Sequence, residues 1–167
     1  MIFVWIILAI FLVIVGVGII GGAPFVPTRK VWIREALELA KISRNDVVLD
    51  LGSGDGAVLA EAVKTGAKRA VGIELNPVLV LWSRLRLAKI SRKIRVESGD
   101  VFAKKWPSDT TVIYIFQVSR VMKKVPQYIR ENRENFAAKK LKVVCFSFEL
   151  PGEKVVATNN GMRLYEF

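Results

Sequence analysis

The chain has 167 residues, enough for one domain with a sizeable core, and its 26 Lys and Arg against 15 Asp and Glu give a formal net charge of +11. It contains no histidine and one cysteine, which excludes histidine-based catalytic triads and disulfides within the chain. The same two counts argue against a structural zinc site, so no metal partner is expected.

The first 28 residues carry no charged side chain, and Ile2 to Ile20 is apolar apart from glycine. Because roughly 20 such residues can cross a bilayer, we predict a transmembrane helix over residues 1–23. A cleaved signal peptide is the alternative, since Gly21-Gly22-Ala23 resembles a cleavage site, but no basic segment precedes the apolar run. Lys and Arg follow the run and none precedes it, which predicts a single-pass membrane protein.

This arrangement of charge places the rest of the chain on the cytoplasmic side of a membrane, or on the matrix side in an organelle. Such a basic domain is expected to have the lipid bilayer as a partner, through anionic headgroups. Residues 24–28 form an extended connector, because two prolines resist helix formation. Residues 29–167 then form one domain, which begins with an amphipathic helix over Arg29 to Lys41.

Strands and helices alternate in this domain, which predicts an α/β fold. The expected strands are Val47 to Leu51, Ala70 to Leu75, Ile94 to Ser98, Thr111 to Phe116, Lys142 to Glu149, Lys154 to Thr158 and Met162 to Phe167, and the expected helices are Ala57 to Thr65, Pro77 to Ile90 and Ser119 to Phe136. The first five strands should lie parallel with helices on both faces. Asn159-Asn160-Gly161 predicts a closing hairpin, which supplies one antiparallel strand.

The first strand ends in a glycine-rich loop that runs from Asp50 to Gly56. Glycines permit positive φ and a close approach of the backbone to a ligand, and Glu74 on the next strand can hold a ribose diol. The glycine spacing also fits a dinucleotide-binding loop. Asp50 and Asp55 favour S-adenosylmethionine instead, because carboxylates attract its sulfonium and ammonium groups and repel a pyrophosphate. A structural turn with a capping aspartate is the remaining alternative.

Further candidates follow the third and fourth strands. Asp100 would accept the adenine amino group while Val101 covers the ring, although Asp100 also fits a helix cap or turn. Phe116 and Gln117 would face the methionine part or the incoming nucleophile. The residues predicted to bind the cofactor are Asp50, Gly52, Ser53, Gly54, Gly56, Glu74, Leu75, Asp100, Val101 and Phe116.

Tyr114 and Glu149 are the predicted catalytic residues. If the acceptor is an amine, either side chain, or water, would take its proton or orient its nitrogen. A solvated strand end is the alternative for Glu149. Methyl transfer otherwise depends on aligning donor and acceptor.

With these residues in place, the chain resembles the class I methyltransferases, and within them small archaeal protein-lysine methyltransferases and their membrane-anchored mitochondrial relatives, which act on the adenine nucleotide translocase or the ATP synthase c-subunit. The resemblance rests on Pro24-Phe25-Val26-Pro27-Thr28, the loop from Asp50 to Gly56, the segment Val71 to Asn76, and Phe148-Glu149. It implies a Rossmann-like, seven-stranded class I methyltransferase sheet, S-adenosylmethionine as cofactor, and transfer to protein lysine ε-amines. Ala57, and Lys139-Lys140, depart from the common pattern and leave the substrate open.

Three functions are therefore considered. The first is a membrane-anchored protein-lysine methyltransferase whose partners are proteins at or near the membrane. The second is a methyltransferase of a lipid or quinone-like molecule, and the third is a cofactor-binding membrane scaffold without activity. Nucleic acid is not an expected partner, because Phe116-Gln117-Val118-Ser119 lacks the Asn/Asp-Pro-Pro-aromatic motif of enzymes that methylate exocyclic base nitrogens.

Overall fold

The computed structural model describes residues 1–21 and 26–167, with part of the side chains of the first helix. The helices are α1 (Ile2–Gly21), α2 (Lys30–Leu39), α3 (Ala57–Thr65), α4 (Pro77–Ala88) and α5 (Ser119–Glu131), followed by the short 3₁₀ helix η1 (Arg133–Asn135). The strands are β1 (Val47–Leu51), β2 (Arg69–Glu74), β3 (Ile94–Ser98), β4 (Val112–Ile115), β5 (Lys142–Phe146), β6 (Ala157–Asn159) and β7 (Met162–Glu166). Residues 24 and 25 of the connector predicted over residues 24–28 lie outside the described residues.

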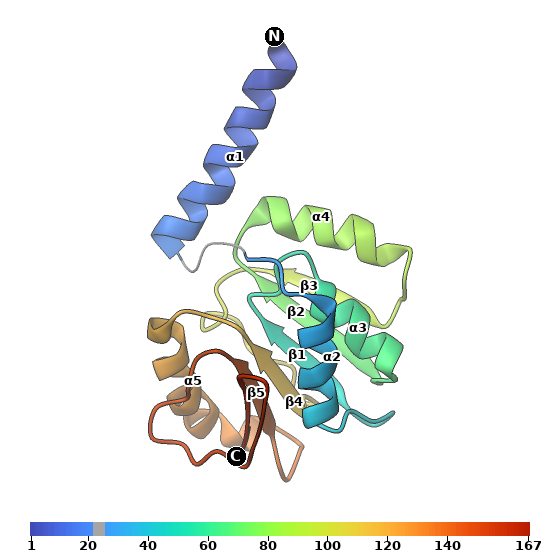
Figure 1. Cartoon of the computed structure of the whole chain (residues 1–167), viewed down its shortest axis with the longest axis vertical. Coiled ribbons are helices and arrows are strands. Elements are labelled where there is room, and N and C mark those ends of the chain that lie inside the picture. The colour runs from blue at the N-terminus through green and yellow to red at the C-terminus, as the bar shows by residue number, and fades with distance from the viewer. Residues whose placement is uncertain (22–25) are drawn as a thin grey trace.

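The seven strands form one sheet in the order β3-β2-β1-β4-β5-β7-β6. Figure 1 labels the parallel strands β1 to β5 of this sheet. Strands β1 to β5 pair in parallel, and β7 pairs antiparallel with both β5 and β6. The order reverses between β1 and β4, which is the switch point where open α/β sheets bind ligands beyond the carboxyl ends of their strands. The predicted seven-stranded, mostly parallel sheet is therefore present.

Side chains alternate between two cores, one on each face of the sheet. Val48, Tyr114 and Phe146 belong to the core that α2, α3 and α4 cover, whereas Leu49 and Cys145 belong to the core that α5 covers. This alternation follows from the two-residue period of a strand. A residue's place in its strand therefore tells which of the two helical layers its side chain meets.

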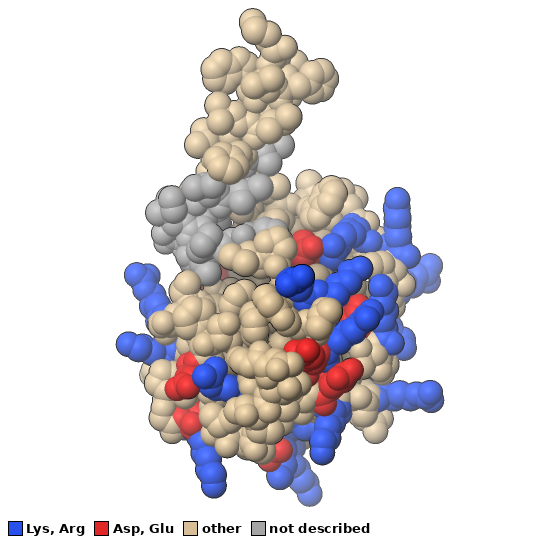
Figure 2. Space-filling model, in the orientation of Figure 1, with Lys and Arg blue, Asp and Glu red and all other residues tan. Residues whose placement is uncertain are grey.

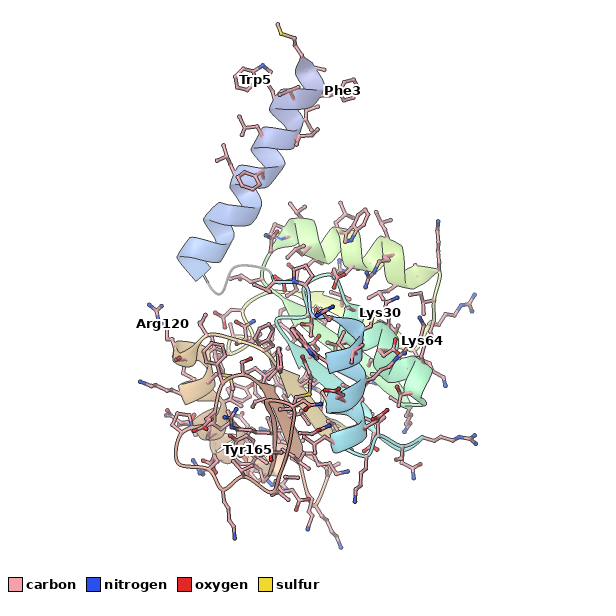
Figure 3. The ribbon with its side chains drawn as sticks, in the orientation of Figure 1. Phe3, Trp5, Lys30, Lys64, Arg120 and Tyr165 are labelled. Atoms are coloured by element: carbon pink, nitrogen blue, oxygen red, sulfur yellow. The ribbon has the colours of Figure 1, made fainter. Side chains whose placement is uncertain are left out.

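The first helix corrects the fold-class prediction. We predict a transmembrane helix over residues 1–23, because roughly 20 consecutive apolar residues can cross a bilayer. Among the described residues, no helix has the length and apolarity of a membrane span. The predicted transmembrane helix is therefore wrong. Helix α1 extends away from the domain, and Phe3 and Trp5 are exposed on it (Figure 3).

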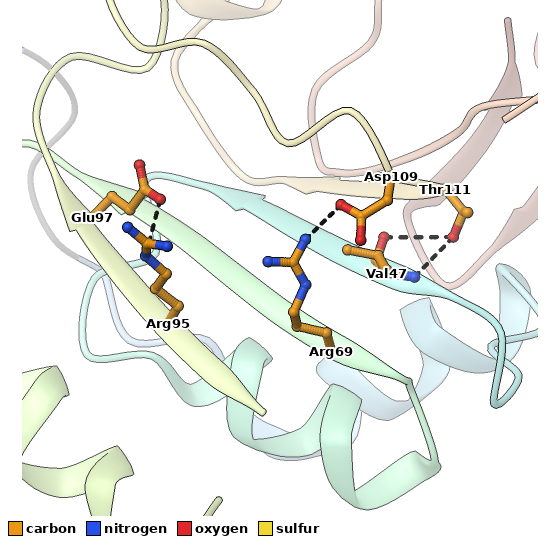
Figure 4. A network of polar contacts seen from close by, with 6 residues as sticks. All are labelled: Val47, Arg69, Arg95, Glu97, Asp109 and Thr111. Carbon is orange, nitrogen blue, oxygen red and sulfur yellow. Dashed lines mark hydrogen bonds and ion pairs between the residues drawn. The ribbon is translucent and has the colours of Figure 1, made fainter. Parts of the chain in front are cut away.

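Hydrogen bonds and ion pairs join the strands at their amino ends (Figure 4). The Val47 amide donates to Thr111 Oγ1 at 3.0 Å, and the Thr111 hydroxyl donates to Asp46 at 2.7 Å. Arg69, the first residue of β2, forms an ion pair with Asp109. Burial opposes ionisation of Asp46, but hydrogen bonds from Ser43 and Thr111 lower its pKa overall. These hydrogen bonds and the ion pair tie β1, β2 and β4 together at their amino ends, whereas the buried Thr110 hydroxyl before β4 has no partner among the described residues.

Candidate functional site

The glycine loop after β1 has the backbone conformation that its glycines permit. Gly52, Gly54 and Gly56 have φ values of 84°, 52° and 76°, in the left-handed region that disfavours other residues. A Cβ on Gly52 would lie 1.9 Å from Nε2 of Gln117, and one on Gly56 would lie 2.4 Å from Cδ1 of Leu87. The loop is therefore packed between the end of β4 and helix α4.

Glu74 lies at the carboxyl end of β2 and is held by backbone donors of two segments. Its Oε2 accepts from the Gly54 amide at 2.8 Å, and its Oε1 accepts from the Asn76 amide at 2.7 Å. The side chain is buried, yet each carboxylate oxygen retains a second lone pair. This fixed carboxylate beside the glycine loop is suited to accepting two vicinal hydroxyls, as the predicted ribose contact requires.

Asp50 is a buried carboxylate without a compensating cation among the described residues. It is 3% exposed, and no described side chain donates a hydrogen bond to it. Burial raises its pKa well above the ordinary value, and the charges of Glu74 and Asp55 raise it further. Burying such a group costs free energy unless a positive charge accompanies it. The buried Asp50 carboxylate therefore fits a cationic ligand, such as the methionine part of S-adenosylmethionine.

Asp55 differs from its sequence interpretation, because both its oxygens have partners within the chain. Oδ2 pairs with Nη1 of Arg86 at 2.8 Å, and Oδ1 accepts from the Ala57 amide at 3.1 Å at the start of α3. Asp55 thus anchors the turn that leads into α3, whose N-cap is Gly56, and the attraction for a cation rests on Asp50. The partnership of Arg86 was missed, since its place among the basic residues of α4 resembles a solvated surface.

Tyr114 lies beside Asp50 on the adjacent strand and on the same face of the sheet. The side chain is 2% exposed, and among the described residues its hydroxyl has no hydrogen-bond partner. Burial raises the pKa of Tyr114 strongly and the charge of Asp50 adds to the rise, whereas the Thr28 side chain, close enough to interact with the hydroxyl, lowers it. The hydroxyl is therefore protonated at neutral pH. It is suited to orienting an amine rather than to acting as a tyrosinate base.

Glu149, the other predicted catalytic residue, lies elsewhere. Strand β5 ends at Phe146, three residues earlier than expected for this segment, because Ser147 has a φ of 63°. Glu149 is exposed and pairs at 3.1 Å with Arg163, which faces Cys145 in the register of β5 and β7. The structure therefore does not bring Glu149 together with Tyr114, and its catalytic role stays a prediction.

The remaining predicted residues lie around the same strand ends. The Asp100 carboxylate accepts from the amides of Phe102 and Ala103 at 2.7 and 3.3 Å, which matches the turn alternative. The Gly99 amide donates to the Glu74 carbonyl at 2.9 Å, so this turn lies beside the end of β2. Val101 is half-buried against the α5 core. Asp100 keeps its second oxygen for a ligand.

Three further positions complete the set. Ser53 is buried, and its hydroxyl has no partner among the described residues. Leu75 is half-buried between β2 and α4. Phe116 is half-buried beyond β4, with its ring 5.1 Å from that of Phe146. No cluster of potential metal ligands is found in the part of the chain that the structure describes.

Comparisons with known proteins identify the family of the chain. The family described as ANTKMT methyltransferase domain matches residues 50–157. A protein-lysine N-methyltransferase of Saccharolobus islandicus is 29% identical over 144 residues, 83% of this chain and 86% of that protein. The ATP synthase c-subunit lysine N-methyltransferases of Xenopus laevis and Homo sapiens are 30% identical over 130 residues, 77% of this chain. The matched regions are 54% and 53% of those two proteins, about half their length.

Solved structures show the same fold. An RNA methyltransferase from Salinibacter ruber in complex with S-adenosyl-L-homocysteine is similar with a TM-score of 0.73 and 31% identity, over 85% of this chain and 92% of that chain. A dimethyladenosine transferase from Plasmodium falciparum has a TM-score of 0.62 at 17% identity, over 73% of this chain and 43% of that chain, and shows the fold alone. The predicted cofactor is thereby confirmed. The chain belongs to the ANTKMT methyltransferase domain family of S-adenosylmethionine-dependent enzymes.

Proposed function

We propose that this methyltransferase modifies lysine ε-amines of proteins. The observation that carries the proposal is the neutral Tyr114 hydroxyl, which has no hydrogen-bond partner among the described residues. It lies toward the carboxyl end of the sheet, beside the buried carboxylate of Asp50. A hydroxyl in an apolar site can accept a hydrogen bond from an amine and so point the lone pair of the amine nitrogen at an electrophile. The relatives named as protein-lysine and ATP synthase c-subunit lysine N-methyltransferases support the same acceptor.

When bound, S-adenosylmethionine supplies a methyl carbon on a sulfonium, so that the N–C bond forms as the C–S electron pair returns to sulfur. Glu74 would hold the ribose hydroxyls and Asp50 would face the cationic methionine part. Apolar surroundings favour the neutral form of a lysine amine, so its proton leaves to water before transfer. Tyr114 keeps its own proton and orients the nitrogen. Its contribution to the rate is to hold the nitrogen close to the methyl carbon and aligned with it.

RNA is a second candidate acceptor. The similar Salinibacter ruber structure is named an RNA methyltransferase, and the net charge of +11 suits a polyanion. Lys and Arg are spread widely over the visible face of the domain (Figure 2). The absence of a base-methylation motif after β4 favours protein instead.

One labelling experiment separates these acceptors. The protein is incubated with methyl-tritiated S-adenosylmethionine and a cell extract divided into soluble and membrane fractions, and label is followed into protein, RNA and lipid. We expect label in protein, on lysine after hydrolysis and amino-acid analysis. Label confined to RNA or lipid contradicts the proposal. The Glu74→Gln variant is the matched control, because it should lose cofactor affinity and label nothing.

The same experiment tests where the acceptors lie. The sequence predicts substrates at or near a membrane, and the relatives named for the ATP synthase c-subunit act, by name, on one component of that complex. If this extends to the present chain, the labelled lysines will be concentrated in the membrane fraction. Equal labelling of soluble proteins would leave the lysine activity standing and remove the preference for membrane-proximal substrates.

A further inference from the structure

We propose that three aromatic residues form a channel for the acceptor lysine side chain, with the Tyr114 hydroxyl at its inner end. The residues are Trp32 of α2, Phe116 directly after β4 and Phe146 at the end of β5, here called the acceptor channel. The ring centroids of Trp32 and Phe146 are 4.9 Å apart, and those of Phe116 and Phe146 are 5.1 Å apart. The inference rests on the proposed function and specifies which residues receive its substrate.

The acceptor channel lies next to the glycine loop. In the register of β1 and β4, Leu51 pairs with Ile115. Gly52, where the glycine loop begins, and Phe116 each follow one of these paired residues, so the loop and the Phe116 ring begin side by side. Gln117 confirms the proximity, because its Nε2 lies 3.4 Å from the Leu51 carbonyl oxygen. A ligand on the glycine loop would therefore present its reactive end toward the aromatic rings.

Tyr114 places a polar group at the inner end of the acceptor channel. It precedes Phe116 by two residues, so both side chains lie on the face covered by α2, and Phe146 lies there too. Its hydroxyl has no hydrogen-bond partner among the described residues, and Glu35 Oε2 on α2, which covers the same face, also has none. A chain of methylenes that ends in an amine would cover the rings and supply that missing partner.

The geometry of the rings favours an alkyl chain over a nucleobase. Trp32 and Phe146 are tilted by 38°, and Phe116 meets Phe146 edge-on at 61°. A stacked base needs an open, flat aromatic face, whereas a lysine stem packs against edges and faces alike. Arg29 lies over Trp32, 5.6 Å from its centroid, and so occupies one face of that ring. Trp32 and Phe116 are only half-buried, which leaves them accessible to a side chain.

A bisubstrate probe tests the channel without knowledge of the natural substrate. The probe is an S-adenosylhomocysteine analogue with nitrogen in place of sulfur and a four-carbon aminoalkyl arm, and its affinity is compared with that of S-adenosylhomocysteine by calorimetry. We expect the arm to increase affinity about tenfold in the wild-type protein. Trp32→Ala should lose most of this gain while its affinity for S-adenosylhomocysteine stays within about twofold.

Two further variants guard against a structural explanation. The gain is the ratio of the affinity for the probe to the affinity for S-adenosylhomocysteine. Trp32→Phe keeps an aromatic wall and should retain most of this gain, whereas Phe116→Ala should lose it. Trp82→Ala on the outer face of α4, where Trp82 is 57% exposed, is the matched control and should change neither affinity. Thermal unfolding of each variant shows that it is folded at the temperature of the measurement.

The outcomes separate the channel from the proposed function. An arm that adds no affinity in the wild-type protein, or a gain that survives both Trp32→Ala and Phe116→Ala, overturns the channel. If extracts are still labelled on lysine in that case, the proposed function stands alone. An arm-dependent gain that Trp32→Ala abolishes, together with label only in RNA or lipid, supports an alkylamine subsite and overturns the lysine function.

Discussion

The two ends of the parallel sheet differ in how many of their polar groups have partners. At the amino ends, Asp46, Val47 and Thr111 satisfy one another and Arg69 pairs with Asp109, although the buried Thr110 hydroxyl has no partner among the described residues. At the carboxyl ends, Asp50 lacks a cation, and the hydroxyls of Ser53 and Tyr114 lack partners among the described residues. Since buried polar groups without partners cost free energy, the amino ends contribute stability and the carboxyl ends give it up for ligand binding. Substitutions at the two ends should therefore have different signatures.

The largest effect is expected at Glu74, which serves both stability and binding. Glu74→Ala removes the acceptor for the buried amides of Gly54 and Asn76, and each lost partner costs about 1–3 kcal/mol. Cofactor affinity should fall by a further 1–3 kcal/mol, about 5- to 150-fold, if the carboxylate holds the ribose. Urea unfolding and calorimetry measure the two losses. Unchanged affinity in a folded variant would rule out the ribose contact.

At Asp50 the two quantities should move in opposite directions. Asp50→Asn removes a buried charge that burial and neighbouring carboxylates disfavour, so the free energy of unfolding of the ligand-free protein should rise by about 1 kcal/mol. The same change removes the partner of a cationic ligand and should weaken S-adenosylmethionine binding by about 1–3 kcal/mol. Glu61→Gln on α3, which breaks a pair with Arg34 away from the glycine loop, is the control and should leave affinity unchanged. A destabilised Asp50→Asn protein would break the comparison between the two ends.

The pH dependence of the same carboxyl group provides a third measurement. The pKa of Asp50 is raised in the folded protein above its ordinary 3.8, so the folded state binds this proton more tightly than the unfolded state. The stability that this tighter proton binding by Asp50 provides is fully present below pH 3.8 and is lost as the pH rises through the folded pKa. Cofactor affinity should increase over the same interval, as the carboxylate ionises. Calorimetry across a pH series should give a slope that is flattened in Asp50→Asn.

The smallest effect is expected at the amino ends. Thr111→Val leaves the Val47 amide and Asp46 without this hydroxyl and should lower the free energy of unfolding by about 1 kcal/mol, with no change in cofactor affinity. Asp46 loses one of the hydrogen bonds that lower its pKa. The difference in free energy of unfolding between wild type and variant should therefore shrink as the pH falls through that pKa. A change in affinity would show that the two ends are coupled through β1 and β4.

The local patterns that the sequence displays predicted most of the fold. Glycine spacing predicted the positive φ of Gly52, Gly54 and Gly56. The largely apolar run of β1 and the apolar–polar alternation of β3 predicted both strands to the residue. Alternation misled at the end of β5, because Phe146-Ser147-Phe148 has the pattern of a strand while Ser147 adopts a left-handed conformation. That conformation is set by tertiary contacts, which no local pattern contains.

Long-range partnerships were the part of the site that sequence did not yield. The pair of Asp55 and Arg86 joins residues 31 positions apart, and a basic residue on a helix does not indicate which turn it reaches. Likewise, only the structure placed the ring of Trp32 beside Phe146. The apolar composition of the first residues predicted the helix α1 correctly and its transmembrane character wrongly.

The contacts between the glycine loop and α4 have a consequence for cooperativity. Arg86 holds Asp55 from outside the loop, and Leu87 fills the space that a side chain at position 56 would need. The loop has little apolar surface of its own, so its order depends on the helix that packs against it. Loop and helix should therefore open as one unit in native-state hydrogen exchange, with the amides of Gly54 and Leu87 exchanging together.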